Sequence, residues 1–121
     1  MVKTYGLTHI SLAVQNPERS LAFYGAVFGA REVYRNATSV QAQTPGSHDI
    51  LAFERRPRKA GAVGGVAHFG FRLKKATDID KAVHDALHVG GRLLRRGEFG
   101  PGLPFAYVAD PDGYEIEIWF E

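Results

Sequence analysis

The chain has 121 residues, of which 45% are hydrophobic and 23% are charged; its formal net charge is +2, and it contains no cysteine. This balance is typical of one globular domain with its own core, and it excludes a disordered chain, a disulfide scaffold and a thiolate metal site, while so small a charge gives no indication of nucleic-acid binding. No apolar run is long enough to cross a membrane and the first ten residues lack the layout of a signal peptide, so we expect a cytoplasmic protein without a membrane partner.

The first half of the chain reads as a strand, a helix and three further strands. Residues 7–14 alternate between apolar side chains and small or polar ones, as a half-buried strand does. Residues 16–18, Asn-Pro-Glu, combine a capping side chain, a proline for the first helical position and an acid near the positive end of the helix dipole. We expect this helix to end at Phe28, before Gly29. The later strand candidates are residues 31–35, 38–43 and 49–54, with a turn at 45–47.

A polar, glycine-containing stretch at 55–65 separates this half from a second, similar one. Its basic part, residues 55–59, is interpreted as a solvated linker, the alternative being a site for a phosphate or an acidic polymer. The same order then returns, with a strand at 67–73, a helix at 78–89, a strand at 92–96 and a hairpin at 105–120. The second helix has a one-sided apolar stripe of Ile79, Ala82, Val83, Ala86 and Leu87. The sequence therefore predicts one domain of two modules, residues 5–54 and 66–121.

The hairpin at 105–120 turns at 110–113, Asp-Pro-Asp-Gly, a sequence that suits a tight turn. After the turn, side chains alternate between the two faces of the strand. Ile116, Ile118 and Phe120 are expected in the core. Glu115, Glu117 and Trp119 are expected on the opposite face.

Aligning the halves places His9 with His68, and Leu51 with Glu117, in matching positions opposite the apolar stripes. A pseudo-twofold axis brings matching positions together, so the sequence predicts His9, His68 and Glu117 as metal ligands. Two histidines and one carboxylate suit a divalent ion with coordination positions left for substrate. Fe(II) or Mn(II) is expected first, with Zn(II) or Ni(II) as alternatives.

Each histidine taken alone is more often exposed or hydrogen-bonded than a ligand. A rival group, Asp80, His84 and His88, repeats every four residues on the second helix, a spacing that can hold a metal. This group lies opposite the apolar stripe, so we interpret it as a solvated surface.

Four segments of the chain, LTHISLAV, SLAFYGAVFGA, AHFGF and YVADPDGYEIEIW, resemble the vicinal oxygen chelate superfamily. This superfamily contains glyoxalase I, bleomycin-resistance proteins, fosfomycin-resistance thiol transferases and extradiol dioxygenases. The resemblance implies an α+β fold of two βαβββ modules, which form a U-shaped mixed sheet around a metal site with the helices on the outer face. It also implies a homodimer with module exchange and a small-molecule substrate that chelates through vicinal oxygens.

The characteristic residues of individual superfamily members favour different functions for this chain. Glyoxalase I resembles the chain but has a fourth ligand, a glutamate, where Leu51 falls, so an ordinary glyoxalase is disfavoured. Extradiol dioxygenases match from Tyr107 to Glu117, although the histidine that should precede the tyrosine is missing. Fosfomycin thiol transferases have the same three ligands, a hydroxyl matched by Ser11 and a tyrosine matched by Tyr107, but their loop lysine and serines are absent at 97–105. Bleomycin-type proteins bind their ligand without metal or catalysis.

The sequence thus predicts a divalent-metal-dependent enzyme with dioxygenase-like chemistry. The alternatives are a fosfomycin-type thiol transferase or lyase, and a non-catalytic protein that binds a small molecule such as an antibiotic. Tyr107 is the predicted catalytic hydrogen-bond donor or proton carrier, the alternative being a cross-strand packing role. Ser11, Phe105 and Trp119 are predicted to contact substrate, although core packing would equally explain the aromatic residues and Phe53. We expect the loop at 97–104 to carry specificity.

Overall fold

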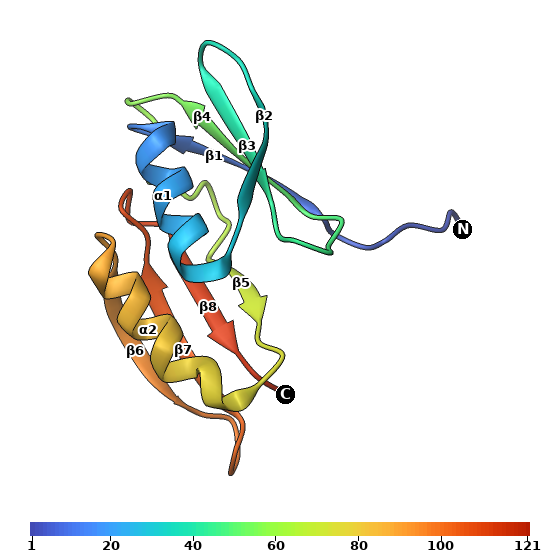
Figure 1. Cartoon of the computed structure of the whole chain (residues 1–121), viewed down its shortest axis with the longest axis vertical. Helices are drawn as coiled ribbons and strands as arrows, with labels where there is room; N and C mark the ends of the chain where they lie inside the picture. The colour runs from blue at the N-terminus through green and yellow to red at the C-terminus, as the bar shows by residue number, and fades with distance from the viewer. The chain divides into compact units, whose positions relative to one another are not determined.

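Each half of the chain folds into one long helix and one four-stranded mixed sheet (Figure 1). The structure, a computed structural model, describes residues 1–121 as two units, residues 1–60 and residues 61–121, here called unit 1 and unit 2. In both units the chain runs as βαβββ, and the first strand pairs in parallel with the last. This confirms the predicted α+β fold of two βαβββ modules. No helix combines the length and the hydropathy that a membrane-crossing helix needs.

Unit 1 follows the local signals of its sequence closely. Its elements are β1 (His9–Val14), α1 (Pro17–Phe28), β2 (Arg31–Arg35), β3 (Ser39–Gln43) and β4 (Ile50–Arg55), in the sheet order β1-β4-β3-β2. The Asn16 side-chain oxygen accepts hydrogen bonds from the backbone N–H groups of Glu18 and Arg19, at 3.0 and 3.3 Å. At the other end Gly29 adopts φ 73°, a left-handed conformation that glycine takes without strain. The predicted helix limits are therefore confirmed.

The core of unit 1 lies between α1 and the sheet. Phe53 on β4 is fully buried, and its ring stacks on that of Tyr24 with the ring centres 5.1 Å apart. Phe23 meets Tyr24 edge to face at 5.1 Å. Phe53 is thus a core residue rather than part of a ligand cavity.

Unit 2 repeats the arrangement with a shorter first strand than predicted. Its elements are β5 (Phe69–Arg72), the short 3-10 helix η1 (Ala76–Asp78), α2 (Ile79–His88), β6 (Arg92–Glu98), β7 (Pro104–Ala109) and β8 (Glu115–Trp119), in the order β5-β8-β7-β6. His68 directly precedes β5 rather than lying within it. Four residues of the predicted stripe on α2 are buried, but Leu87 is half exposed, because at 100° per residue it falls on the flank of that stripe.

The repeat extends to an irregularity in each sheet. The register of β2 against β3 shifts between Glu32 and Tyr34, and that of β6 against β7 shifts between Leu93 and Arg95. An extra residue at the same point of each edge strand strengthens the local twist and re-aims the following side chain. Tyr34 and Arg95 are therefore structural counterparts.

The predicted match of Leu51 with Glu117 is wrong by one residue. Glu117 pairs with Gly70, the counterpart of Ser11, and Ser11 pairs with Ala52. Leu51 is 3% exposed and lies on the face of the sheet that packs on α1. The cause is the connection between β3 and β4, which is one residue longer than that between β7 and β8. Ala52 therefore occupies the position of Glu117 in unit 1, and alanine offers no ligand atom.

Candidate functional site

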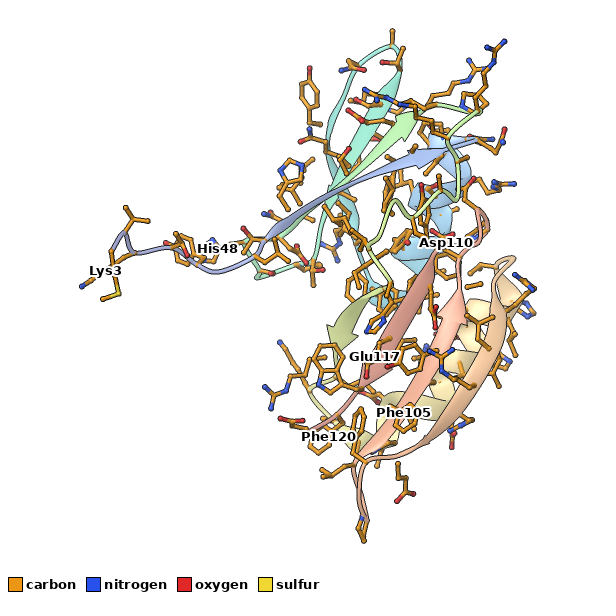
Figure 2. The ribbon with its side chains drawn as sticks, turned by 180° about the vertical axis from the view of Figure 1, so that it is seen from behind. Lys3, His48, Phe105, Asp110, Glu117 and Phe120 are labelled. Carbon is orange, nitrogen blue, oxygen red and sulfur yellow. The ribbon has the colours of Figure 1, made fainter.

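The candidate site lies on the side of the unit 2 sheet that is turned away from α2, here called the helix-free face. Figure 2 shows Glu117 and Phe105 on this side of the sheet. The strand pairing places further residues there with them: Gly70, Arg72, Arg95, Gly97, Tyr107, Glu115 and Trp119. Most of the residues predicted to act on substrate or metal in this half therefore share one face.

His68 and Glu117 form the polar centre of the helix-free face. The His68 Nε2 atom lies 3.2 Å from the Glu117 Oε2 atom. Tyr107 is paired with Glu117 across β7 and β8, and its ring meets the imidazole of His68 edge to face at 5.2 Å. An imidazole, a carboxylate and a phenol hydroxyl are thus gathered on three neighbouring segments.

The hairpin turn sets this arrangement through local hydrogen bonds. The Asp110 side-chain oxygen accepts from the backbone N–H groups of Asp112 and Tyr114, at 2.9 and 3.0 Å, and Gly113 adopts φ 95°. A turn of fixed length fixes the strand register. Tyr107 and Glu117 face each other for this reason.

The alternation of β8 then decides which side chains face α2. Ile116 and Ile118 are fully buried on that side, whereas Glu117 is directed away from it and keeps 17% of its side chain exposed. Burial of both isoleucines stabilises this orientation, because a one-residue slip would exchange their places with Glu115 and Glu117.

The charged groups around Tyr107 shift its pKa in opposite directions. Partial burial raises the pKa of Tyr107, and the negative charge of Glu117 and a hydrogen bond with it raise that pKa further. Arg95 acts in the opposite direction; its guanidinium lies over the tyrosine ring, 3.9 Å from the ring centre. Arg95 is itself paired with Glu115 at 2.5 Å. Tyr107 therefore keeps its proton at neutral pH and is available as a hydrogen-bond donor.

Sequence reasoning missed Arg95 and Glu115 as parts of this site. Strand alternation gave the face of Glu115, but nothing local indicated that Arg95 would face the same way, because the irregularity in β6 sets its direction. A comparison of edge strands across the repeat is the signal that would have found it.

The predicted residues of the first half lie on β1. His9 and Ser11 are both exposed, on the face of the unit 1 sheet opposite α1, as the alternation of β1 predicted. They occupy the positions that match His68 and Gly70 in unit 2. Within neither unit do three His, Asp or Glu side chains gather around a common point that could hold a metal ion.

The donor atoms in unit 2 suit a divalent metal ion. An imidazole nitrogen and a carboxylate oxygen that approach to 3.2 Å on a strand-fixed face are ligands of the type that Mn(II), Fe(II) and Zn(II) take. The Glu117 side chain is half-buried on strand β8 and contacts His68, so its carboxylate is oriented before any ion binds. His68 and Glu117 therefore fit as two members of the predicted ligand set.

The rival group on α2 is a solvated surface. The Asp80 carboxylate is bound by Arg96 at 2.6 Å. His84 and His88 are exposed, and their rings stack 5.7 Å apart. The side chains are thus engaged with protein partners in a manner typical of an exposed helix surface.

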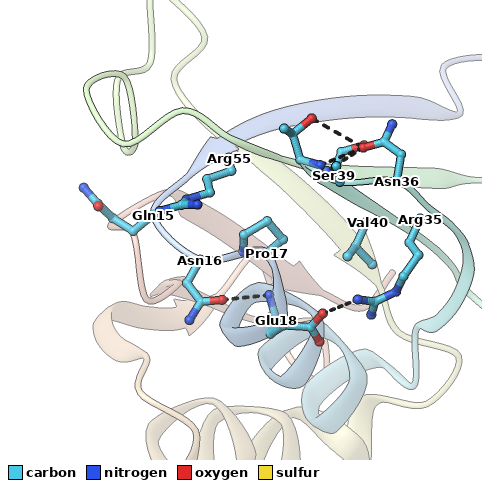
Figure 3. Close-up of a pocket in the computed structure, with 11 residues that line it drawn as sticks. Gln15, Asn16, Pro17, Glu18, Arg35, Asn36, Ser39, Val40 and Arg55 are labelled. Atoms are coloured by element: carbon cyan, nitrogen blue, oxygen red, sulfur yellow. Dashed lines mark hydrogen bonds and ion pairs between the residues drawn. The ribbon is translucent and has the colours of Figure 1, made fainter.

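A separate depression of about 350 Å³ lies in unit 1 at the start of α1, lined by residues 15–18, 35–40 and 55 (Figure 3). Glu18 is paired with Arg35 at 2.6 Å, and the Asn16 oxygen caps the helix. Arg35 also binds Glu32 and lowers its pKa. None of the predicted site residues lines this depression.

A family model described as the glyoxalase/bleomycin resistance protein/dioxygenase superfamily matches residues 6–118. The chain belongs to this superfamily. No curated protein sequence matches the chain, but solved structures do. A glyoxalase-related enzyme from Fulvimarina pelagi is 27% identical, with 98% of this chain and 89% of that chain covered and a TM-score of 0.75.

Two fosfomycin-resistance proteins have the same superfamily fold. FosX from Mesorhizobium loti is 20% identical, with 98% of this chain and 94% of that chain covered and a TM-score of 0.79. A variant of FosX from Listeria monocytogenes, solved with Mn(II) and 1S,2S-dihydroxypropylphosphonic acid, is 19% identical, with coverages of 96% and 90% and a TM-score of 0.77. At these identities the likeness establishes the fold.

Proposed function

We propose that the chain is a divalent-metal-dependent enzyme that acts on a small molecule chelating through vicinal oxygens, with His9, His68 and Glu117 as the metal ligands. The observation that carries this proposal is the 3.2 Å approach of His68 to Glu117 on the helix-free face. The repeat supplies His9 as the third ligand, because it holds in β1 the position that His68 holds before β5. Two histidines and one carboxylate leave coordination positions for substrate oxygens.

The bound ion would supply a Lewis acid and a template for two substrate oxygens. Tyr107 donates a hydrogen bond from its hydroxyl, or passes that proton to the substrate, next to Glu117. Ser11 offers a hydroxyl from the face that carries His9. Phe105 and Trp119, both half-buried on the helix-free face, hold the apolar part of the substrate.

The first candidate reaction is dioxygenase-like. It is supported by the segment from Tyr107 to Glu117, which resembles the dioxygenase signature. The second is a fosfomycin-type addition of a thiol to an epoxide, supported by the likeness to FosX, one example of which was solved with Mn(II). The third is non-catalytic binding of a small molecule.

We further propose that the two modules act as one domain and that the chain forms a homodimer in which modules are exchanged. The linker at 55–65 permits this, because eleven residues at about 3.3 Å each can reach a module of the same chain or one of a partner. The resemblance to the superfamily favours the exchange.

Metal content tests the ligand set directly. Protein purified without chelator is expected to hold about one divalent ion per chain, and His68→Ala is expected to lose nearly all of it, because two remaining ligands bind such ions weakly. Elemental analysis measures both. His84→Ala is the matched control, since His84 lies on exposed α2, and it is expected to keep the ion. Equal metal content in the His68→Ala and His84→Ala proteins would refute the site.

The reaction class is tested by two assays on one preparation. A dioxygenase loaded anaerobically with Fe(II) is expected to consume oxygen when a catechol is added, whereas a thiol transferase loaded with Mn(II) is expected to form an adduct from an epoxide and a thiol. Tyr107→Phe is expected to lower the productive rate by about 10²-fold or more, because it removes a proton donor. Tight ligand binding with no turnover in either assay would support the non-catalytic function instead.

A further inference from the structure

Aromatic rings form a continuous series on the helix-free face, leading away from the His68–Glu117 pair. The ring of His68 meets Tyr107 at 5.2 Å, Tyr107 meets Phe105 at 5.8 Å, and Phe105 stacks on Phe99 at 4.7 Å. Phe99 begins the turn between β6 and β7 and is 55% exposed. A large apolar ring left so exposed, and joined by contacts to a polar pair, is characteristic of a binding surface.

Two glycines allow the rings to lie against the sheet. A side-chain carbon added at Gly97 would come within 3.0 Å of the Phe105 ring, and one added at Gly70 would come within 2.7 Å of the Trp119 ring. Both approaches are closer than a real carbon allows without movement. Phe105 and Trp119 are neighbours across β7 and β8. Gly97 and Gly70 therefore leave space for two adjacent rings.

Two cations on this face are already paired. Arg95 is bound to Glu115 at 2.5 Å, and Arg72 donates to the main-chain oxygen of Glu121. The turn that carries Phe99 contains no Lys or Arg from residue 98 to residue 104, and its one charged residue is Glu98. The far end of the face from His68 therefore offers ring surfaces and no free positive charge to an anionic group such as a phosphonate.

We propose that this end of the helix-free face binds an aromatic ring of the substrate, with Phe99 and Phe105 as the residues that determine specificity. The ring stacks on the phenylalanines while the two neighbouring oxygens of the same molecule lie at the His68–Glu117 end. Offset or edge contacts between rings, together with burial of apolar surface, stabilise such a complex. The inference rests on the proposed function for the position of the oxygens, but not for the binding of the ring.

Mandelate and lactate test the inference, because both carry a hydroxyl next to a carboxylate and differ only in a phenyl ring against a methyl group. Trp119 is the single tryptophan of the chain and lies on the same face, so its fluorescence reports binding. In wild-type protein loaded with Mn(II), mandelate is expected to bind at least about tenfold more tightly than lactate. If the protein takes up no Mn(II), the same titrations are made without metal.

Gly97→Ala is expected to shift the Phe105 ring by a few tenths of an ångström and to lower the mandelate-to-lactate affinity ratio. Gly100→Ala is the matched control in the same turn, since its added carbon meets only Leu103 at 3.8 Å, and it is expected to keep the ratio. Phe99→Ala changes an exposed side chain and is expected to lower the ratio without unfolding the protein.

The outcomes separate this inference from the proposed function. Metal binding with equal affinities for mandelate and lactate, or with a ratio that Phe99→Ala leaves unchanged, overturns the inference while the metal site stands. A preference for mandelate that Phe99→Ala abolishes supports the inference even when no metal binds. No detectable binding of either acid also overturns it.

Discussion

Protein carrying His9→Ala, refolded together with protein carrying Glu117→Ala, is expected to regain about one quarter of the wild-type metal content. Each variant alone is expected to hold almost none. If every site takes His9 from one chain and His68 with Glu117 from the other, a mixed dimer contains one intact site and one doubly damaged site. Random pairing makes about half of the dimers mixed, which gives the quarter.

The measurement is elemental analysis of the refolded mixture after gel filtration. A mixture of His9→Ala with His9→Ala,Glu117→Ala protein is the control, because no pairing of these chains restores a site. Recovery in the first mixture alone demonstrates a shared site. Metal content that stays at the level of the separate variants would show that each site lies within one chain and would contradict the proposed exchange.

Phe53→Ala is expected to destabilise unit 1 by about 3–5 kcal/mol, the usual cost of removing a fully buried aromatic side chain. Phe53 is 0% exposed and stacks on Tyr24, so its removal leaves a cavity that α1 and the sheet cannot easily close. Urea unfolding followed by circular dichroism measures the loss of free energy of unfolding.

Tyr34→Ala is the control for this substitution, because Tyr34 is an aromatic residue of the same unit that is 53% exposed on edge strand β2. Its replacement is expected to change stability by about 0.5 kcal/mol or less. Similar losses for the two variants would mean that Phe53 does not form the core. That result would support the alternative that Phe53 lines a ligand cavity.

Local chemistry explains why much of the fold is readable from the sequence. The limits of α1 follow from Asn16, Pro17 and Gly29, each of which acts on the backbone within a few residues of itself. The hairpin of β7 and β8 follows from the turn at 110–113 and from strict alternation after it. The second half repeats the same order of elements with different local signals, so the βαβββ order is predicted twice from different residues.

The same repeat predicted that His68 and Glu117 would share a face, and their side chains approach to 3.2 Å. Alternation decides the face of Glu117 on β8 without knowledge of its partners, whereas His68 lies directly before β5. The ligand role of this pair, and of His9 with it, stays a prediction for the metal experiment.

The pairing register of β4 in the unit 1 sheet could not be predicted from the sequence. Alignment of the two halves matches Leu51 with Glu117, whereas Ala52 occupies that position in the structure. The reason is one extra residue between β3 and β4, which shifts the pairing of β4 by one residue. A shift of one residue exchanges the two faces of a strand. Only the hydrogen-bond ladder and the packing of Leu51 and Phe53 against α1 decide which shift occurs.

The contacts around the candidate site likewise depend on pairing between distant strands. The sequence separates Arg95 from Glu115 by twenty residues and Gly97 from Phe105 by eight, with no local signal that joins them. Pairing of β6 with β7, and of β7 with β8, brings Arg95 and Glu115 to 2.5 Å and lays the Phe105 ring over Gly97. Neighbours along the chain therefore set the limits of most elements and the faces of His9 and Glu117, since capping, turns and strand alternation are local. The charge balance at Tyr107 and the ring surface beside it were decided only when distant strands paired, because long-range contacts set both.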